Sequence, residues 1–244
     1  MIRPTKTAVL IARRIVRDIT ERHLRPGDRI ASERAMLDEY QVARGTLREA
    51  LRYLEMQGVI TMRLGPTGGP VVSSPTHRNL ASTLTLCAHR TGGRFRDVLD
   101  TREILEPVMA ARAAVHIDEC GLEVLRDTIE QMESARGDVD AFLDQNRRFH
   151  ETIASSSGNS LFGLLIESLH GITDGTALGV DYPTKHRDHV MRAHARILDG
   201  IERSDPYAAA AAMSQHLGEF STYMWHRYPE LMNHVLEWDV EALQ

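Results

Sequence analysis

The chain has 244 residues, of which 42% are apolar and 26% are charged, and its formal net charge is −5. This length suits two modest domains, and this composition is ordinary for a protein with an apolar core. Arg, His or Asp interrupts every apolar run before the ~18 residues that a transmembrane helix needs, so we expect no membrane span. The two cysteines, Cys87 and Cys120, lie in stretches with the pattern of apolar helices, and no secretory leader is recognisable, which predicts a cytoplasmic protein with reduced thiols.

The charge is distributed unevenly along the chain. Residues 1–75 contain 13 Lys and Arg and 8 Asp and Glu, a net charge of +5, whereas the remainder has a net charge of −10. A basic segment beside an acidic one is typical of a polyanion-binding domain joined to a second domain with another role. Chance asymmetry in a small domain is the alternative, so charge alone does not assign a function.

The first 58 residues have the spacing of three helices. Apolar residues recur at helical intervals over 7–21, and a Pro-Gly pair follows at 26–27. A short second helix is expected to begin after Ser32, which is a good N-cap residue. The third helix is predicted over 44–57, because its apolar positions repeat and Gly58 favours the position that follows a helix.

A hairpin is predicted immediately after these helices. The segments 59–63 and 70–72 favour strands, and they flank the glycine-rich run 65–69, which favours an open tip. Three helices followed by a hairpin make a winged helix-turn-helix. We therefore assign residues 1–75 to a DNA-binding domain.

The rest of the chain is helical in period. Seven helices are expected at about 78–90, 95–116, 119–135, 139–156, 160–172, 187–203 and 206–226. The predicted fold class is mainly α, with a winged helix-turn-helix and its small β-hairpin wing followed by an all-α bundle. In the predicted domain organisation, residues 76–90 form a linker and first helix, 91–230 an all-α domain, and 231–244 a C-terminal tail.

The start of the third helix is the predicted DNA-reading element. In a helix-turn-helix, the outward residues of the first turn of the recognition helix reach base edges in the major groove. Arginine suits guanine because its planar fork meets O6 and N7 together, and a glycine in the wing lets the backbone approach a groove. Solvation of an outer helix face is the alternative role for these arginines. The predicted DNA-binding residues are Arg34, Arg44, Gly45, Thr46, Arg48 and Gly68.

The second half contains a possible metal-ligand set. Asn146 and His150 are four residues apart on one predicted helix, hence on one face. His194 and His216 each lie eleven residues from Asp205, the expected cap of the last long helix, so an antiparallel hairpin would place both at one height. Three neutral imidazoles with open coordination positions suit Zn²⁺ or Ni²⁺. Separately hydrogen-bonded core histidines are the alternative.

The motifs of the first 70 or so positions resemble the winged-helix domain of the GntR family of bacterial transcription regulators. They are Pro26-Gly27-Asp28, Ser32-Glu33-Arg34, Val42-Ala43-Arg44, Leu47-Arg48-Glu49-Ala50-Leu51, Gly58 and the glycine wing. The family usually has serine where Ala43 stands, so the usual cap of the recognition helix is missing. A later capping box of Thr46 and Glu49 would shift the start of this helix.

The second half resembles the FCD ligand-binding domain of the FadR branch of the same family, which implies that residues 91–230 form a ligand-binding and dimerisation domain. Its motifs are Arg102 with Glu106, Asn146…Phe149-His150, His194 and Met213-x-x-His216. In metal-binding members an aspartate and three histidines occupy the ligand positions. The resemblance therefore implies a divalent metal, Zn or Ni, bound by Asn146, His150, His194 and His216, with Asn146 in place of the usual aspartate.

This substitution affects the expected effector. A divalent ion without a protein carboxylate keeps its whole formal charge, so a carboxylate effector becomes a favourable extra ligand. Arg102 could clamp the same anion through two hydrogen bonds. The alternative role of Arg102 is a structural salt bridge to Glu103, Glu106 or Glu167.

Together these features predict a homodimeric transcription regulator, expected to be a repressor, which reads an inverted repeat in double-stranded DNA and senses a small organic acid. A metallohydrolase is one alternative, since His150-Glu151-Thr152-Ile153-Ala154 begins like the H-E-x-x-H motif. Its fifth residue is alanine, so a ligand is missing and we expect no enzyme. A DNA-associated architectural protein with an inert helical body is the other alternative.

Overall fold

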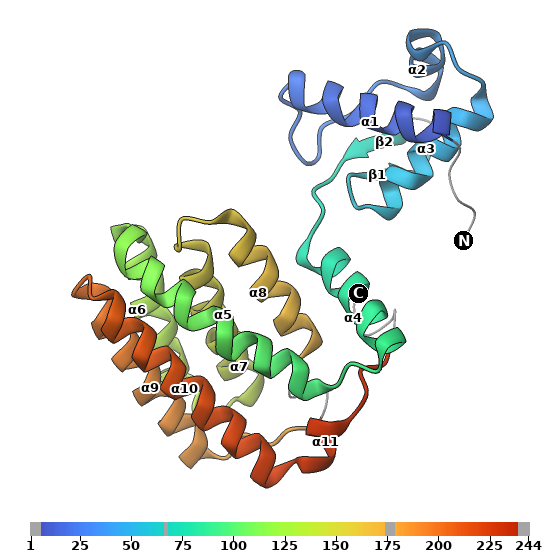
Figure 1. The fold of residues 1–244 in the computed structure, drawn as a ribbon. Coiled ribbons are helices and arrows are strands. Elements are labelled where there is room, and N and C mark those ends of the chain that lie inside the picture. Colours follow the sequence, from blue (N-terminus) through green and yellow to red (C-terminus); the bar gives the residue numbers. More distant parts are fainter. Residues whose placement is uncertain (1–5, 66–67, 174–178, 239–244) are drawn as a thin grey trace. The chain divides into compact units, whose positions relative to one another are not determined.

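The computed structural model describes residues 6–65, 68–173 and 179–238, and it divides the chain into two compact units, Met1–Asn79 and Leu80–Gln244. The first unit contains three helices and a hairpin, as the sequence predicts (Figure 1). Each of the three helices and the first strand contributes at least one buried apolar residue to its core. The elements are α1 (Lys6–Glu21), α2 (Glu33–Tyr40), α3 (Arg44–Met56), β1 (Ile60–Arg63) and β2 (Gly69–Val72).

The junction between α2 and α3 forms the turn of the helix-turn-helix. The Ser32 hydroxyl caps α2 by accepting a hydrogen bond from the backbone N–H of Ala35 at 3.3 Å. Gln41 ends α2 in the left-handed region, with φ of 52°. The third helix begins at Arg44, directly after Ala43, so the later start that a Thr46 and Glu49 capping box would produce is not observed.

The wing is a two-stranded antiparallel hairpin in which Ile60 pairs with Val72 and Arg63 pairs with Gly69. Its tip requires glycine, because a Cβ atom on Gly68 would lie 2.2 Å from the backbone oxygen of Arg63. The backbone N–H of Gly68 donates to the carbonyl oxygen of Gly65 at 2.8 Å. The two central tip positions, 66 and 67, lie outside the described residues.

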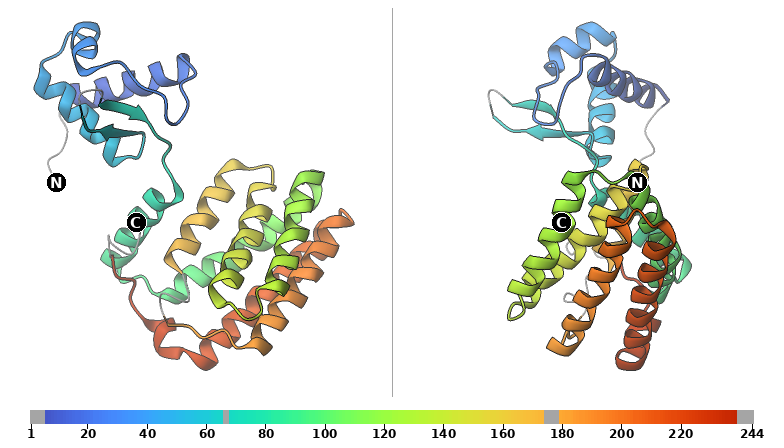
Figure 2. Two further views of the ribbon diagram at one scale, coloured as in Figure 1. Left: turned by 180° about the vertical axis from the view of Figure 1, so that it is seen from behind. Right: turned by 90° about the vertical axis from the view of Figure 1, so that its left-hand side faces the viewer.

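The second unit is an all-α bundle (Figures 1 and 2). The long helix α5 packs along α10, α9 lies beside α10, and α7 packs against α6 and α8. The core is continuous across these helices, with Met109, Leu125, Phe149, Ile166 and Ile197 fully buried or nearly so. Its elements are α4 (His77–Thr91), α5 (Phe95–His116), α6 (Glu119–Ser134), α7 (Val139–Ser155), α8 (Ser160–Ile172), α9 (Thr184–Glu202), α10 (Pro206–Arg227) and α11 (Pro229–Asn233).

The hairpin of α9 and α10 is tight. The Asp205 carboxylate caps α10 by accepting a hydrogen bond from the backbone N–H of Ala208 at 2.9 Å, and Pro206 occupies the first turn. A Cβ atom on Gly200 would lie 2.7 Å from the backbone nitrogen of Ala209, so glycine lets the two helices approach closely. This geometry sets the relative height of the side chains on α9 and α10.

Three expectations need correction. The ninth helix begins at Thr184 rather than near 187, because Pro183 already serves as its N-cap. The expected tail begins inside a short helix, α11, which the sequence pattern did not indicate. Cys87 and Cys120 lie in stretches expected to be apolar, yet both free thiols are exposed.

Candidate metal centre and nucleic-acid interface

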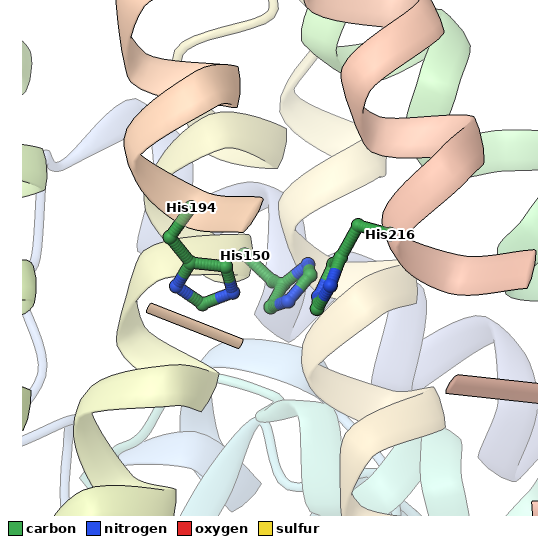
Figure 3. Close-up of side chains that lie close together, drawn as sticks. All are labelled: His150, His194 and His216. Carbon is green, nitrogen blue, oxygen red and sulfur yellow. The ribbon is translucent and has the colours of Figure 1, made fainter. Parts of the chain in front are cut away.

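Three buried histidines from three helices meet inside the bundle (Figure 3). His150 comes from α7, His194 from α9 and His216 from α10, and each offers a ring nitrogen within 4.8 Å of the others. The ring centroids of His194 and His216 are 4.9 Å apart, so the equal spacing of both residues from Asp205 correctly predicts their proximity. The His150 ring centroid lies 5.1 Å from that of His194 and 5.3 Å from that of His216.

A carboxylate from α5 orients the first of these imidazoles. Oε2 of Glu106 lies 2.5 Å from Nδ1 of His150, which leaves Nε2 as the ring nitrogen available to a metal. Nε of Arg102 donates to Oε1 of the same carboxylate at 2.6 Å. Burial by itself would raise the pKa of Glu106, but the Arg102 guanidinium and the His150 imidazole together lower it below its usual range. Glu106 is therefore ionised while almost completely buried.

The other two histidines are neutral imidazoles. Burial lowers the pKa of His194 and of His216 well below the usual value for histidine, and the neighbouring imidazoles add to this effect. His194 packs flat on Phe149, with ring centroids 3.9 Å apart. Among the described residues, neither ring nitrogen of His194 has a hydrogen-bond partner. Convergent buried imidazole nitrogens, of which both nitrogens of His194 lack a hydrogen-bond partner among the described residues, fit a divalent metal ion, so these three residues can hold one.

Asn146 lies one helical turn before His150 and is half-buried. It lines a cavity beside the histidines, and Arg102 lines the same cavity, so the structure brings both predicted residues to this place. The nearby Asp144 does not take the place of Asn146 as a metal ligand, because its carboxylate is exposed and accepts a hydrogen bond from Nη2 of Arg147 at 2.6 Å. The alternative role of Arg102 is also observed, since its salt bridge to Glu106 is present.

The cavity has a volume of about 80 Å³, which is room for several water molecules or a small organic molecule. Both apolar and polar side chains line it, as is usual for a ligand pocket. Two of the polar residues, Arg147 and His170, were not among the predicted site residues. Neither residue belongs to a recognised sequence motif, and only the packing of α7 and α8 places both in the cavity wall. The polar lining includes Arg102, Asn146, Arg147, His150, His170 and His216.

We expect Glu106→Gln to lower the free energy of unfolding by about 3–5 kcal/mol, because it leaves the buried guanidinium of Arg102 without a counter-charge. The same variant should bind Zn²⁺ about 10–100-fold more weakly, because His150 loses the carboxylate that orients it. Urea unfolding and a competitive zinc titration measure the two effects. Glu119→Gln is the control, since its ion pair with Arg126 is exposed and should leave both quantities nearly unchanged. Unchanged zinc affinity in Glu106→Gln would separate this carboxylate from the metal site.

The predicted DNA-binding residues lie on one end of α3 and on the elements near it in sequence. Arg44, Gly45 and Arg48 are exposed, and Thr46 is half-buried. Leu47, which lies between Arg44 and Arg48 in sequence, is fully buried in the core of the first unit, whereas both arginines remain exposed at the start of the helix. Two predicted residues remain. Arg34 is exposed on α2, and Gly68 is half-buried at the wing.

Comparison with known proteins identifies both parts of the chain. Residues 7–66 match the bacterial regulatory proteins of the gntR family, and residues 97–219 match the FCD domain. The chain belongs to the GntR family. Its FCD domain is the type found in the FadR subfamily.

Relatives of this GntR-family chain extend over both domains. It is 29% identical over 207 residues to the uncharacterized HTH-type transcriptional regulator YcbG of Bacillus subtilis (strain 168), covering 85% of each chain. It is 24% identical over 235 residues to the HTH-type transcriptional repressor NanR of Escherichia coli (strain K12 / DH10B), covering 93% of this chain and 88% of NanR. The solved structure of Streptococcus agalactiae GntR matches with a TM-score of 0.66 and 26% identity, over 88% of this chain and 99% of the other.

The family membership assigns a transcriptional regulator, with a DNA-binding helix-turn-helix and an FCD domain that binds a small-molecule effector. Its relatives and both domains are those of regulators and not of enzymes. The segment that begins like H-E-x-x-H has a buried alanine, Ala154, at its fifth position. Within the described ranges, no helix combines the length and apolar character that a membrane-spanning segment requires.

Proposed function

We propose that this chain is a homodimeric transcriptional repressor that binds an inverted-repeat operator and releases it when a small organic acid binds beside a Zn²⁺ or Ni²⁺ ion. Residues 1–75 are the DNA-binding head and residues 91–230 the sensing and dimerisation domain, and the protein acts on DNA in the bacterial cytoplasm. The observation that carries this proposal is the convergence of three buried imidazoles beside a cavity that Arg102 also lines. The name of the related repressor NanR supports the sign of regulation.

The donor set favours Zn²⁺ or Ni²⁺. Imidazole nitrogens suit both ions, whereas Mg²⁺ and Ca²⁺ prefer oxygen ligands. His150, His194 and His216 supply the nitrogen donors, and the amide oxygen of Asn146 is the proposed fourth donor. In this arrangement all four protein ligands are neutral, so a bound ion carries its full positive charge toward the cavity.

That charge selects an anion. The Arg102 guanidinium is neutralised by Glu106, so it does not oppose the ion, yet its Nη atoms remain for hydrogen bonds to a ligand in the cavity. A carboxylate satisfies both an uncompensated divalent ion and a guanidinium fork. When bound, the metal would supply a Lewis-acidic contact, while Arg102 orients the carboxylate.

Dimerisation is supported by an exposed apolar stripe on α5. Ile104, Val108 and Val115 are 71%, 52% and 63% exposed, and their spacing places them along one helix face. Contiguous exposed apolar side chains mark interaction surfaces, and a second copy of the chain would cover this stripe. A two-fold dimer presents two recognition helices to two half-sites, which is why the operator should be an inverted repeat.

Isothermal titration calorimetry with and without a chelator tests the sensing mechanism. We expect a hydroxylated or simple carboxylate to bind the Zn²⁺-loaded protein and to lose its affinity after the metal is removed, because the ion is the main positive charge at the site. The same acid should weaken operator binding, since an effector shifts the equilibrium only toward the state that it binds better. An acid that binds equally well to the metal-free protein would remove the metal from the mechanism.

A further inference from the structure

A fourth histidine lines the cavity but lies outside the group of three. His170 sits in the last turn of α8, and its side chain is 7% exposed. Its ring centroid is 5.8 Å from that of His150, with the two ring planes nearly perpendicular. Neither of its ring nitrogens has a hydrogen-bond partner among the described residues.

An unpartnered buried imidazole costs free energy, so its presence in a cavity wall needs an explanation. The nearest acidic group is Glu151, whose Oε1 is 3.5 Å from Nδ1 of His170 without the geometry of a hydrogen bond. Burial, and then Arg102, lower the pKa of His170 well below the usual value. His170 is almost completely buried and hydrogen-bonds no carboxylate of the described residues, which disfavours a charged imidazolium, so it is a neutral ring with one N–H donor and one acceptor nitrogen.

A hydroxyl group matches this ring better than a second carboxylate does. A hydroxyl can donate to or accept from a neutral imidazole in either tautomer and adds no charge, whereas a second ionised carboxylate would add a negative charge to a buried site beside Glu151. The short separation of the His170 and His150 rings limits the ligand group at His170 to within a few bonds of a group bound at the histidine cluster. The small volume of the cavity imposes the same limit.

We propose that His170 is an effector-binding residue that hydrogen-bonds a hydroxyl group, so that the effector is a small hydroxy acid rather than a simple carboxylic acid. This inference rests on the proposed function, because it takes the carboxylate of the same ligand to lie at Arg102 and the metal. His170 would then determine which acid is sensed, while the three clustered histidines determine that an acid is sensed at all.

Matched acids that differ by one hydroxyl test this role. The probes are malate against succinate and lactate against propionate, titrated by calorimetry into the Zn²⁺-loaded protein. We expect the wild type to bind the better hydroxy acid at least about tenfold more tightly than its deoxy analogue, because the hydroxyl pairs with the ring and the hydrogen that replaces it cannot. His170→Phe should abolish this preference while leaving zinc content and the affinity for the deoxy acid unchanged. His170→Gln, which keeps a donor and an acceptor, should retain part of the preference.

Thermal melting of the metal-free protein separates a ligand role from a structural one. The His170 ring gives up no hydrogen bond when it is replaced, so His170→Phe should melt at the same temperature as the wild type or higher. A clear fall in melting temperature would indicate that the ring holds the fold together, and would overturn the inference. His226→Phe, at an exposed position of α10, is the control for the substitution itself.

The outcomes also distinguish this inference from the proposed function. If the wild type binds each pair of acids equally, or if His170→Phe keeps the hydroxyl preference, the role of His170 is overturned and metal-dependent sensing stands. If the Zn²⁺-loaded wild type binds none of the four acids, both proposals fall for this ligand class. Loss of the preference in His170→Phe alone, with wild-type zinc content, supports the inference.

Discussion

The variant His194→Ala is expected to bind Zn²⁺ more than ~100-fold more weakly than the wild type, a larger loss than the 10–100-fold typical of outer-sphere changes at metal sites. His194 is fully buried, and both of its ring nitrogens lack partners among the described residues, so the imidazole has no evident role other than ligation and packing on Phe149. Removing one of three nitrogen donors leaves too few ligands to hold the ion in place.

Two measurements check this result. A competitive titration with a chromogenic chelator gives the zinc affinity directly. Thermal melting with zinc at ~100 times its Kd should stabilise the wild type by about 2.7 kcal/mol and leave the variant almost unaffected. The matched control is His189→Ala on the same helix, whose ring pairs with Glu219 outside the cluster. Equal zinc stabilisation of His194→Ala and the wild type would mean that the three imidazoles do not form the metal site.

Arg44→Ala and Arg48→Ala are each expected to weaken operator binding by about 1–3 kcal/mol, roughly 5- to 140-fold, and to relax the preference for one base pair of each half-site. Both arginines are exposed in the first turns of α3, on either side of the buried Leu47 in sequence. A fork that pairs with guanine loses both hydrogen bonds when truncated, so specific binding falls more than non-specific binding does.

Gel-shift titrations over a salt series separate base contacts from phosphate contacts. A residue that reads a base changes sequence preference, whereas a residue that contacts only phosphate weakens all sequences alike and lowers the salt slope by about one. Arg192→Ala, at an exposed position of α9, should match the wild type in both respects. Unchanged sequence preference in both α3 variants would exclude direct readout by these side chains.

The secondary structure of this chain is largely predictable from its sequence. The periodicity of apolar residues predicts α5 over its observed bounds. Ser32 and Asp205, whose residue types favour N-cap positions, cap α2 and α10. These features depend on interactions within one or two helical turns, so the local sequence contains the information for them. The pairing of His194 with His216 was also predictable, because a tight hairpin converts equal spacing into equal height.

The residues that surround the three histidines could be identified only from the tertiary structure. Glu106 contacts His150 across 44 positions of sequence, and no spacing rule predicts that Glu106 binds His150 and Arg102 at the same time. His170 reaches the cavity only because α8 packs against α7, and α11 forms where the chain turns back toward the first residues of α5. Contacts between distant helices depend on how whole faces pack and on which polar groups lose water together, and these are properties of the assembled bundle rather than of any one segment.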